Sequence, residues 1–173
     1  LSGKTRMGPQ KFCIPCHDLK DEELHYTDCG LDNIYLSNGF EIEDVDGEQY
    51  VTIHNLDGLH EAIGLHIVLE KKAPNGQEIR FLRTEMGLSQ QHLGAKLGVS
   101  DQSVARWEKG QTDIPGTAVF SFKVLYVFSL MRESERAEIL EEFISALDDL
   151  ACSDEIGDTI RLVYNDEKWA DAA

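Results

Sequence analysis

Apolar and polar residues alternate along the first third of the chain. The runs IYLS and FEIE each alternate, and Asn38-Gly39 stands between them. A period of two is typical of half-buried strands, and Asn-Gly supplies the positive φ angles of a two-residue hairpin turn. Asp46-Gly47, ahead of EQYVTI, predicts a second turn. With LHYTDC upstream, the pattern predicts an antiparallel meander of about three or four strands.

The apolar spacing changes to helical intervals after residue 56. The segment LDGLHEAIGLHIVLEKK (56–72) carries one apolar stripe, and APNG (73–76) interrupts it. The segment AVFSFKVLYVFSLM (118–131) is apolar on nearly every side, which predicts a buried helix. Residues 132–150 follow the pattern of an acidic amphipathic helix, and TIRLVY near the C-terminus suggests a strand.

Three short helices are predicted between these segments, in EIRFLRTEMG, SQQHLGAKLG and SDQSVARWEKG. Ser89 and Ser100 stand at N-cap positions, and Gly98 permits a sharp turn between the second and third helices. Two short helices joined by a glycine-containing turn are the physical form of a helix-turn-helix. In DNA-binding examples the second helix lies in the major groove, with its N-terminal residues facing base edges.

The third short helix supplies the candidate DNA contacts. Val104 and Trp107 must face inward to hold this helix, so its other face is free to meet DNA. The candidate base contacts are Asp101, Gln102, Ser103 and Arg106. Glutamine can bond adenine through two hydrogen bonds, and arginine can do so with guanine. The candidate phosphate contacts are Ser89, Gln90, Lys109 and Arg83. An alternative stays open, in which the polar side chains are merely solvated and Asp101 complements the helix dipole.

The charge distribution supports the same segment. The chain has a net charge of −16, which disfavours contact with DNA in general. Residues 77–110 are the exception, with five Lys/Arg against four Asp/Glu. We therefore expect specific DNA binding to depend on a local positive face, formed by Arg80, Arg83, Lys96, Arg106 and Lys109.

The motif CIPCH (13–17) has three chemical interpretations. Cys-x-x-Cys-His is the spacing of c-type haem attachment, half of a zinc site, or a redox dithiol. Nothing in the sequence directs export, so we expect no haem. A redox dithiol requires a βαβ context, whereas the neighbouring strands look antiparallel. A zinc site would use Cys13, Cys16 and Cys29, with the fourth ligand open among the nearby histidines and aspartates. The alternative, that no metal binds, stays open.

No signal peptide and no apolar run of about 20 residues is found, so we expect a cytoplasmic protein without a membrane partner. No Ser/His/Asp arrangement, phosphate-binding glycine loop or recognisable acid pair is found either, so we expect no enzymatic activity. The predicted fold class is α+β. A small antiparallel β-meander, a candidate zinc-binding domain with its linking helix, occupies 1–73. An all-α helix-turn-helix domain occupies 74–131, and an acidic helix and tail occupy 132–173.

LRTEMGLSQQHLGAKLGVSDQSVARWEKGQTDIP resembles the Xre/Cro-repressor type of helix-turn-helix over residues 77–115. Over residues 13–130 the chain is similar to the MqsA/YgiT-type antitoxin regulators. The resemblance lies in the CxxC, YTDCGLDNIYL, the hairpin, LDGLH..IG and EIRFLR. This resemblance implies an N-terminal zinc-binding domain, a homodimer that represses from a palindromic operator and, in many members, a neutralised toxin ribonuclease. The sequence departs from the family where EDVDGE replaces the second CxxC pair, and residues 131–173 extend past the usual end.

The expected function is a dimeric, antitoxin-like autorepressor that reads double-stranded operator DNA with the helix at 100–109. The buried helix at 118–131 is the candidate dimer interface, with Phe122 and Leu125 as its test residues. The alternative is a protein-binding module without an essential DNA role. Its acidic N- or C-terminal surfaces would then dock on a basic partner, such as a cognate toxin.

Overall fold

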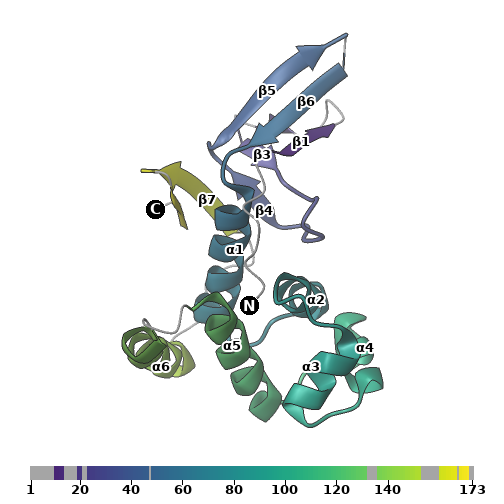
Figure 1. Ribbon diagram of the computed structural model, residues 1–173, viewed down its shortest axis with the longest axis vertical. Coiled ribbons are helices and arrows are strands. Elements are labelled where there is room, and N and C mark those ends of the chain that lie inside the picture. Colours follow the sequence, from purple (N-terminus) through teal and green to yellow (C-terminus); the bar gives the residue numbers. More distant parts are fainter. Residues whose placement is uncertain are drawn as a thin grey trace. The chain divides into compact units, whose positions relative to one another are not determined.

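The computed structural model describes residues 10–13, 19–20, 23–46, 48–131, 136–152, 160–166 and 168–171 (Figure 1). These residues form strands and then helices, with two further strands at the C-terminal end. The chain divides into two compact units. One comprises residues 1–63 together with 158–173, and the other comprises residues 64–157. The α+β fold class predicted from the sequence is confirmed.

The first unit contains two sheets. In the three-stranded sheet β6 (Glu48–Ile53) lies between β1 (Gln10–Cys13) and β5 (Phe40–Val45), and all pairs are antiparallel. The second sheet has the order β2-β3-β4-β7-β8. Its strands are β2 (Leu19–Lys20), β3 (Glu23–His25), β4 (Ile34–Leu36), β7 (Ile160–Asn165) and β8 (Lys168–Asp171).

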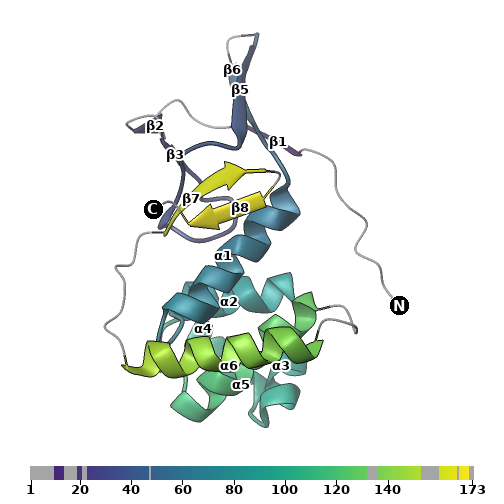
Figure 2. The same cartoon turned by 90° about the vertical axis from the view of Figure 1, so that its left-hand side faces the viewer.

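The C-terminal strands complete the second sheet. β4 pairs with β7 in parallel, with Ile34 opposite Ile160 and Leu36 opposite Leu162. These four side chains are fully or almost fully buried. β7 then turns back into β8 as an antiparallel hairpin (Figure 2). Residues far apart in the sequence therefore share one hydrophobic core, and the strand suggested by TIRLVY is present.

The hairpin predicted at Asn38-Gly39 is wrong. β4 and β5 do not pair, because they belong to different sheets. The Asn38 side chain bonds the backbone of Tyr164, donating to its carbonyl at 3.1 Å and accepting from its N–H. Gly39 keeps the predicted positive φ of 79°. A side chain there would collide with Trp169, so the glycine allows a bend between two sheets instead of a hairpin. β5 and β6 do pair as an antiparallel hairpin, with Val45 opposite Glu48 and Asp46 at φ 57°, as the second predicted turn requires.

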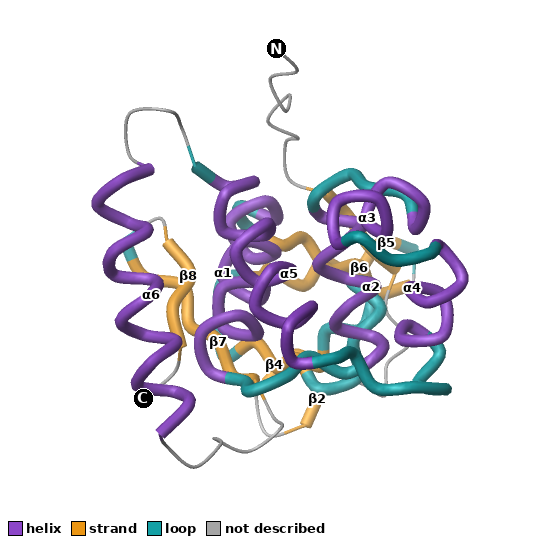
Figure 3. Tube along the Cα trace, turned by 90° about the horizontal axis from the view of Figure 1, so that it is seen from below, coloured by secondary structure: helices purple, strands orange, loops and turns teal. Residues whose placement is uncertain are grey.

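The second unit is helical. α1 (Leu56–Glu70) runs from the first unit into the second, and α2 (Gly76–Glu85), α3 (Gln90–Leu97), α4 (Asp101–Glu108), α5 (Gly116–Leu130) and α6 (Arg136–Cys152) follow. α5 lies between α6 and the group α2, α3 and α4 (Figure 3). No helix in the described ranges is both long and apolar enough to cross a bilayer.

Buried polar residues connect the helices of this unit. Lys71, just after α1, lies 2.7 Å from Glu78 Oε1, and both side chains are almost wholly buried. Glu78 also completes a capping box with Asn75 at the start of α2. Lys123 of α5 donates a hydrogen bond to the Lys71 carbonyl. Buried charges are stable when they are paired and hydrogen-bonded, so these contacts fix how α1, α2 and α5 meet.

Candidate nucleic-acid interface

The two helices α3 and α4 form a helix-turn-helix with capped ends. Ser89 Oγ accepts from His92 N, and Ser100 Oγ accepts from Ser103 N, each at 3.1 Å. Gly98 ends α3 in the left-handed region, with φ 70°. Both predicted N-caps and the glycine turn are confirmed. The caps satisfy backbone N–H groups that a helix cannot bond internally, and so they fix where each helix begins.

The turn between the helices is closely packed. Gly94, on α3, is buried, and a side chain at this position would come within 2.8 Å of the Val99 carbonyl oxygen. The backbones of α3 and of the turn can approach each other only because Gly94 has no side chain. This contact sets the angle at which α4 leaves the turn.

α4 has one buried and one exposed face. Val104 and Trp107 are buried against the rest of the unit, as the sequence predicts. Gln102 and Arg106 are exposed on the opposite face, in the first and last turns of the helix. A helix anchored by two buried side chains presents its outer side chains in a fixed geometry, and both exposed residues have side chains suited to base edges.

The other two candidate base contacts are engaged within the helix itself. Asp101 is exposed, and its carboxylate accepts from the N–H of Gln102 at 2.8 Å. Ser103 is half-buried, and its hydroxyl lies 2.9 Å from that of Ser100. These contacts favour structural roles at the start of α4, and base contact by Asp101 and Ser103 stays a prediction.

Glu108, at the end of α4, is a buried hydrogen-bond centre. Its carboxylate accepts from Arg83 Nε at 2.5 Å and Nη2 at 3.2 Å, and from Gln90 Nε2 at 2.8 Å. Arg83 Nη1 also donates to the Leu88 carbonyl at 2.7 Å. The network joins α2, α3 and α4. Sequence reasoning missed Glu108, because no periodic pattern connects it to Arg83, which lies 25 residues upstream.

The predicted phosphate contacts occupy different environments. Ser89 and Lys109 are exposed, at the start of α3 and the end of α4. Gln90 and Arg83 are bound to Glu108, and the Arg83 side chain is only 12% exposed. The structure brings all four to the helix-turn-helix, and phosphate contact stays a prediction for each.

Burial changes the charge that the helix-turn-helix presents to its surroundings. Of the four acids in 77–110, Glu78 and Glu108 are ion-paired, with side chains 1% and 5% exposed. Asp101 is exposed and Glu85 is half-buried. Four of the five cations are exposed, namely Arg80, Lys96, Arg106 and Lys109. The surface of this segment is therefore more positive than its sequence charge indicates.

The candidate dimer residues lie on α5 but differ in exposure. Phe122 is fully buried within its own chain, so it has no surface to offer a second subunit. Its truncation would therefore change the stability of the unit directly. Leu125 is half-buried. The exposed aromatic residue of α5 is Phe120, at 52%.

The candidate zinc ligands are described only in part. Cys13 ends β1, Cys16 and His17 lie outside the described residues, and Cys29 is half-buried with its Sγ 4.0 Å from the Tyr26 carbonyl oxygen. Within the described part of the chain, no three His, Cys, Asp or Glu side chains gather as a metal site. Zinc binding stays a prediction.

Comparisons with known proteins match the same segment. A helix-turn-helix family model matches residues 79–121. Two uncharacterised HTH-type transcriptional regulators, from Sinorhizobium medicae (strain WSM419) and Rhizobium meliloti (strain 1021), are each 40% identical over 50 residues. Each match covers 25% of this chain and 36% of the relative, so the chain spans about a third of these relatives. No solved structure gives a significant match. By geometry and by family match, residues 79–121 of this chain are a helix-turn-helix domain.

Proposed function

We propose that this protein is a sequence-specific DNA-binding transcriptional regulator that inserts α4 into the major groove. The observation that carries the proposal is the two-sided α4. Val104 and Trp107 anchor one face, and Gln102 and Arg106 project from the other. The names of the two matched relatives, both transcriptional regulators, support the same function.

The exposed side chains of this surface fall into candidate base contacts and candidate phosphate contacts. Gln102 and Arg106 would read adenine and guanine edges, each pair discriminating by about 1–3 kcal/mol. Lys109 and Ser89, with Arg80 and Lys96 nearby in the sequence, would contact phosphates and set the register. The remaining chain is strongly acidic, so we expect weak binding to random duplex and a high ratio of specific to non-specific affinity.

The finer proposal is a dimeric autorepressor of the antitoxin type. One recognition helix reads a half-site, so a palindromic operator requires two copies with their helices about one DNA turn apart. The resemblance to MqsA/YgiT-type regulators over 13–130 supports dimerisation, autorepression and a toxin partner. The resemblance supports zinc binding less directly, because the second CxxC pair is absent. Zinc binding is therefore tested separately, by metal analysis of the purified protein.

A second candidate function is protein binding by the acidic first unit. β5 lies at the edge of its sheet, and Glu41, Glu43 and Asp44 are all exposed on it together with Ile42. A basic protein surface would complement this strand. The two functions are compatible, and DNA binding is distinguished by its steep loss of affinity with rising salt.

The experiment is a selection from short fragments of the source genome, near 100 mM salt, with the full chain. We expect recovery of a palindrome that Arg106→Ala no longer binds and Arg161→Ala still binds. Arg161 is the matched control, because it is an exposed arginine in the other unit. If folded protein enriches no fragment, the DNA-binding proposal is refuted. Enrichment that Arg106→Ala leaves intact refutes the role of α4.

A further inference from the structure

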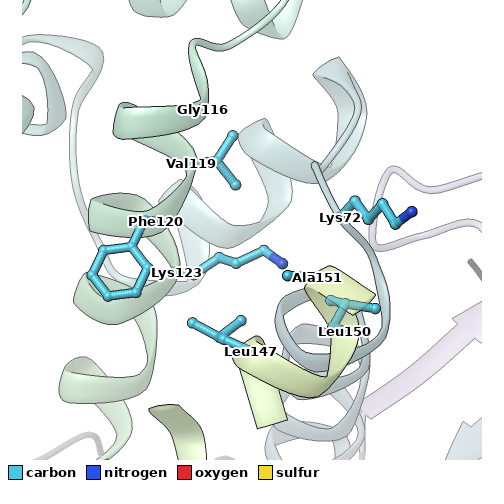
Figure 4. Close-up of a pocket in the computed structure, with 8 residues that line it drawn as sticks. All are labelled: Lys72, Gly116, Val119, Phe120, Lys123, Leu147, Leu150 and Ala151. Carbon is cyan, nitrogen blue, oxygen red and sulfur yellow. The ribbon is translucent and has the colours of Figure 1, made fainter. Parts of the chain in front are cut away.

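A cavity of about 360 Å³ lies between α5 and α6 in the second unit, and none of its lining residues belongs to α3 or α4. α5 contributes Gly116, Val119, Phe120 and Lys123, α6 contributes Leu147, Leu150 and Ala151, and Lys72 lies at its edge (Figure 4). The volume falls in the range of about 300–1,000 Å³ that small-molecule sites occupy. Nothing in the proposed DNA-binding function uses this cavity.

The walls of the cavity are apolar, and one buried cation reaches into it. Val119, Leu147 and Leu150 supply aliphatic surface. Lys123 is 2% exposed and extends from α5 toward Ala151, whereas the Lys72 nitrogen points away (Figure 4). A polar group placed precisely in an otherwise apolar site is the pattern that orients a ligand and selects its chemistry.

The position of Lys123 is fixed by its surroundings. Its ammonium donates to the Lys71 carbonyl, and the Lys71 side chain is itself bound to Glu78. Glu78 also accepts from Asn75 N at 2.8 Å, so this buried carboxylate is already committed to the start of α2. A carboxylate in the cavity would lie beside this buried ammonium, and the attraction between opposite charges is strong where little water screens it.

Phe120 gives a second, independent indication. It lines the cavity but remains 52% exposed, which makes it one of the few large hydrophobic side chains exposed in the described chain. A ligand with an apolar body would cover the inner face of this ring. Exposed apolar surface next to a cavity is typical of a binding site.

We propose that the cavity between α5 and α6 binds a small amphipathic carboxylate, with its carboxylate on Lys123 and its apolar body against Val119, Phe120, Leu147 and Leu150. A singly charged head group fits better than a phosphate, because the lining offers one inward ammonium and no guanidinium to share a second charge. The inference goes beyond DNA binding and is independent of it.

The test is calorimetric titration of the full chain with octanoate, with octanol and acetate as controls that each lack one feature. We expect saturable one-to-one binding of octanoate and much weaker binding of both controls. Lys123→Met removes the charge at nearly constant length and is expected to weaken octanoate binding at least ~10-fold. Lys96→Met removes an exposed lysine of α3 that does not line the cavity, and it is expected to stay within about 2-fold of wild type.

A filling variant keeps the test decisive if Lys123→Met does not fold. Ala151 is exposed at the cavity, so Ala151→Phe occupies the space without disturbing the core and is expected to weaken binding at least ~10-fold. No saturable binding to folded wild type overturns the proposal. Octanoate binding that Ala151→Phe leaves unchanged also overturns it. Octanoate binding that appears only after a self-associated form is diluted overturns it as well, because a second copy of the chain would then cover the groove.

Discussion

Replacement of Glu108 by alanine tests whether the buried network under α4 holds the helix-turn-helix together. The change removes the acceptor of two bonds from Arg83 and one from Gln90. It leaves the Arg83 guanidinium, only 12% exposed, without its carboxylate. Breaking one partner of a buried ion pair costs about 3–5 kcal/mol. Arg83 keeps its bond to the Leu88 carbonyl, so we expect the lower end, about 3 kcal/mol.

The assay is urea denaturation followed by the fluorescence of Trp107. Trp107 lies buried in the helical unit, and Trp169→Phe removes the other tryptophan, which belongs to the first unit. In this background Glu108→Ala is expected to lower the free energy of unfolding of the helical unit alone. A far-UV circular dichroism spectrum checks that the variant is folded before urea is added.

The double variant Arg83→Met with Glu108→Leu separates the ion pair from general packing. Apolar replacement of both partners leaves no buried unpaired charge, so we expect it to recover most of the stability that Glu108→Ala loses. A loss below about 1 kcal/mol for Glu108→Ala would refute the argument, because it would mean that the charge is well solvated. A double variant less stable than Glu108→Ala would also refute it.

Three further predictions concern single contacts, each measured by urea denaturation. Gly64→Ala is expected to destabilise the helical unit by about 1–3 kcal/mol, because the new Cβ would overlap the hydroxyl and the ring of Tyr126, and the cost should be much smaller in a Tyr126→Ala background, which lacks the ring. Ile160→Ala is expected to cost about 2–5 kcal/mol in the first unit, since its side chain is fully buried against β4. Ser100→Ala is expected to cost about 1 kcal/mol by removing the N-cap of α4, and a change of under a few tenths would contradict the cap's role.

The helix-turn-helix could be predicted from the sequence because its signals are local. Ser89 and Ser100 cap the helices that follow them by a few residues, and Gly98 ends α3. The burial of Val104 and Trp107 follows from helical spacing alone. The outward positions of Gln102 and Arg106 follow from the same spacing, so this part of the candidate site could be predicted from the sequence.

Contacts between distant segments could not be predicted in the same way. Asn38-Gly39 has the local preferences of a hairpin, but Asn38 bonds the backbone of Tyr164, which lies 126 residues away. β7 then occupies the edge of β4, and β5 pairs elsewhere. The alternation of apolar and polar residues in a strand does not indicate which other strand will pair with its edge, because the alternation is the same for any partner. The parallel β4–β7 pair therefore could not be predicted from the sequence and is known only from the structure.

The proposed contact between Arg106 and a guanine allows the most direct test of the account. Fluorescence anisotropy would measure the affinity of wild type and Arg106→Ala for the selected operator and for an operator with that guanine replaced. We predict that each single change weakens binding by about 1–3 kcal/mol and that the two together cost little more than either alone, because both remove the same contact. Fully additive losses would contradict the claim that α4 reads DNA through Arg106.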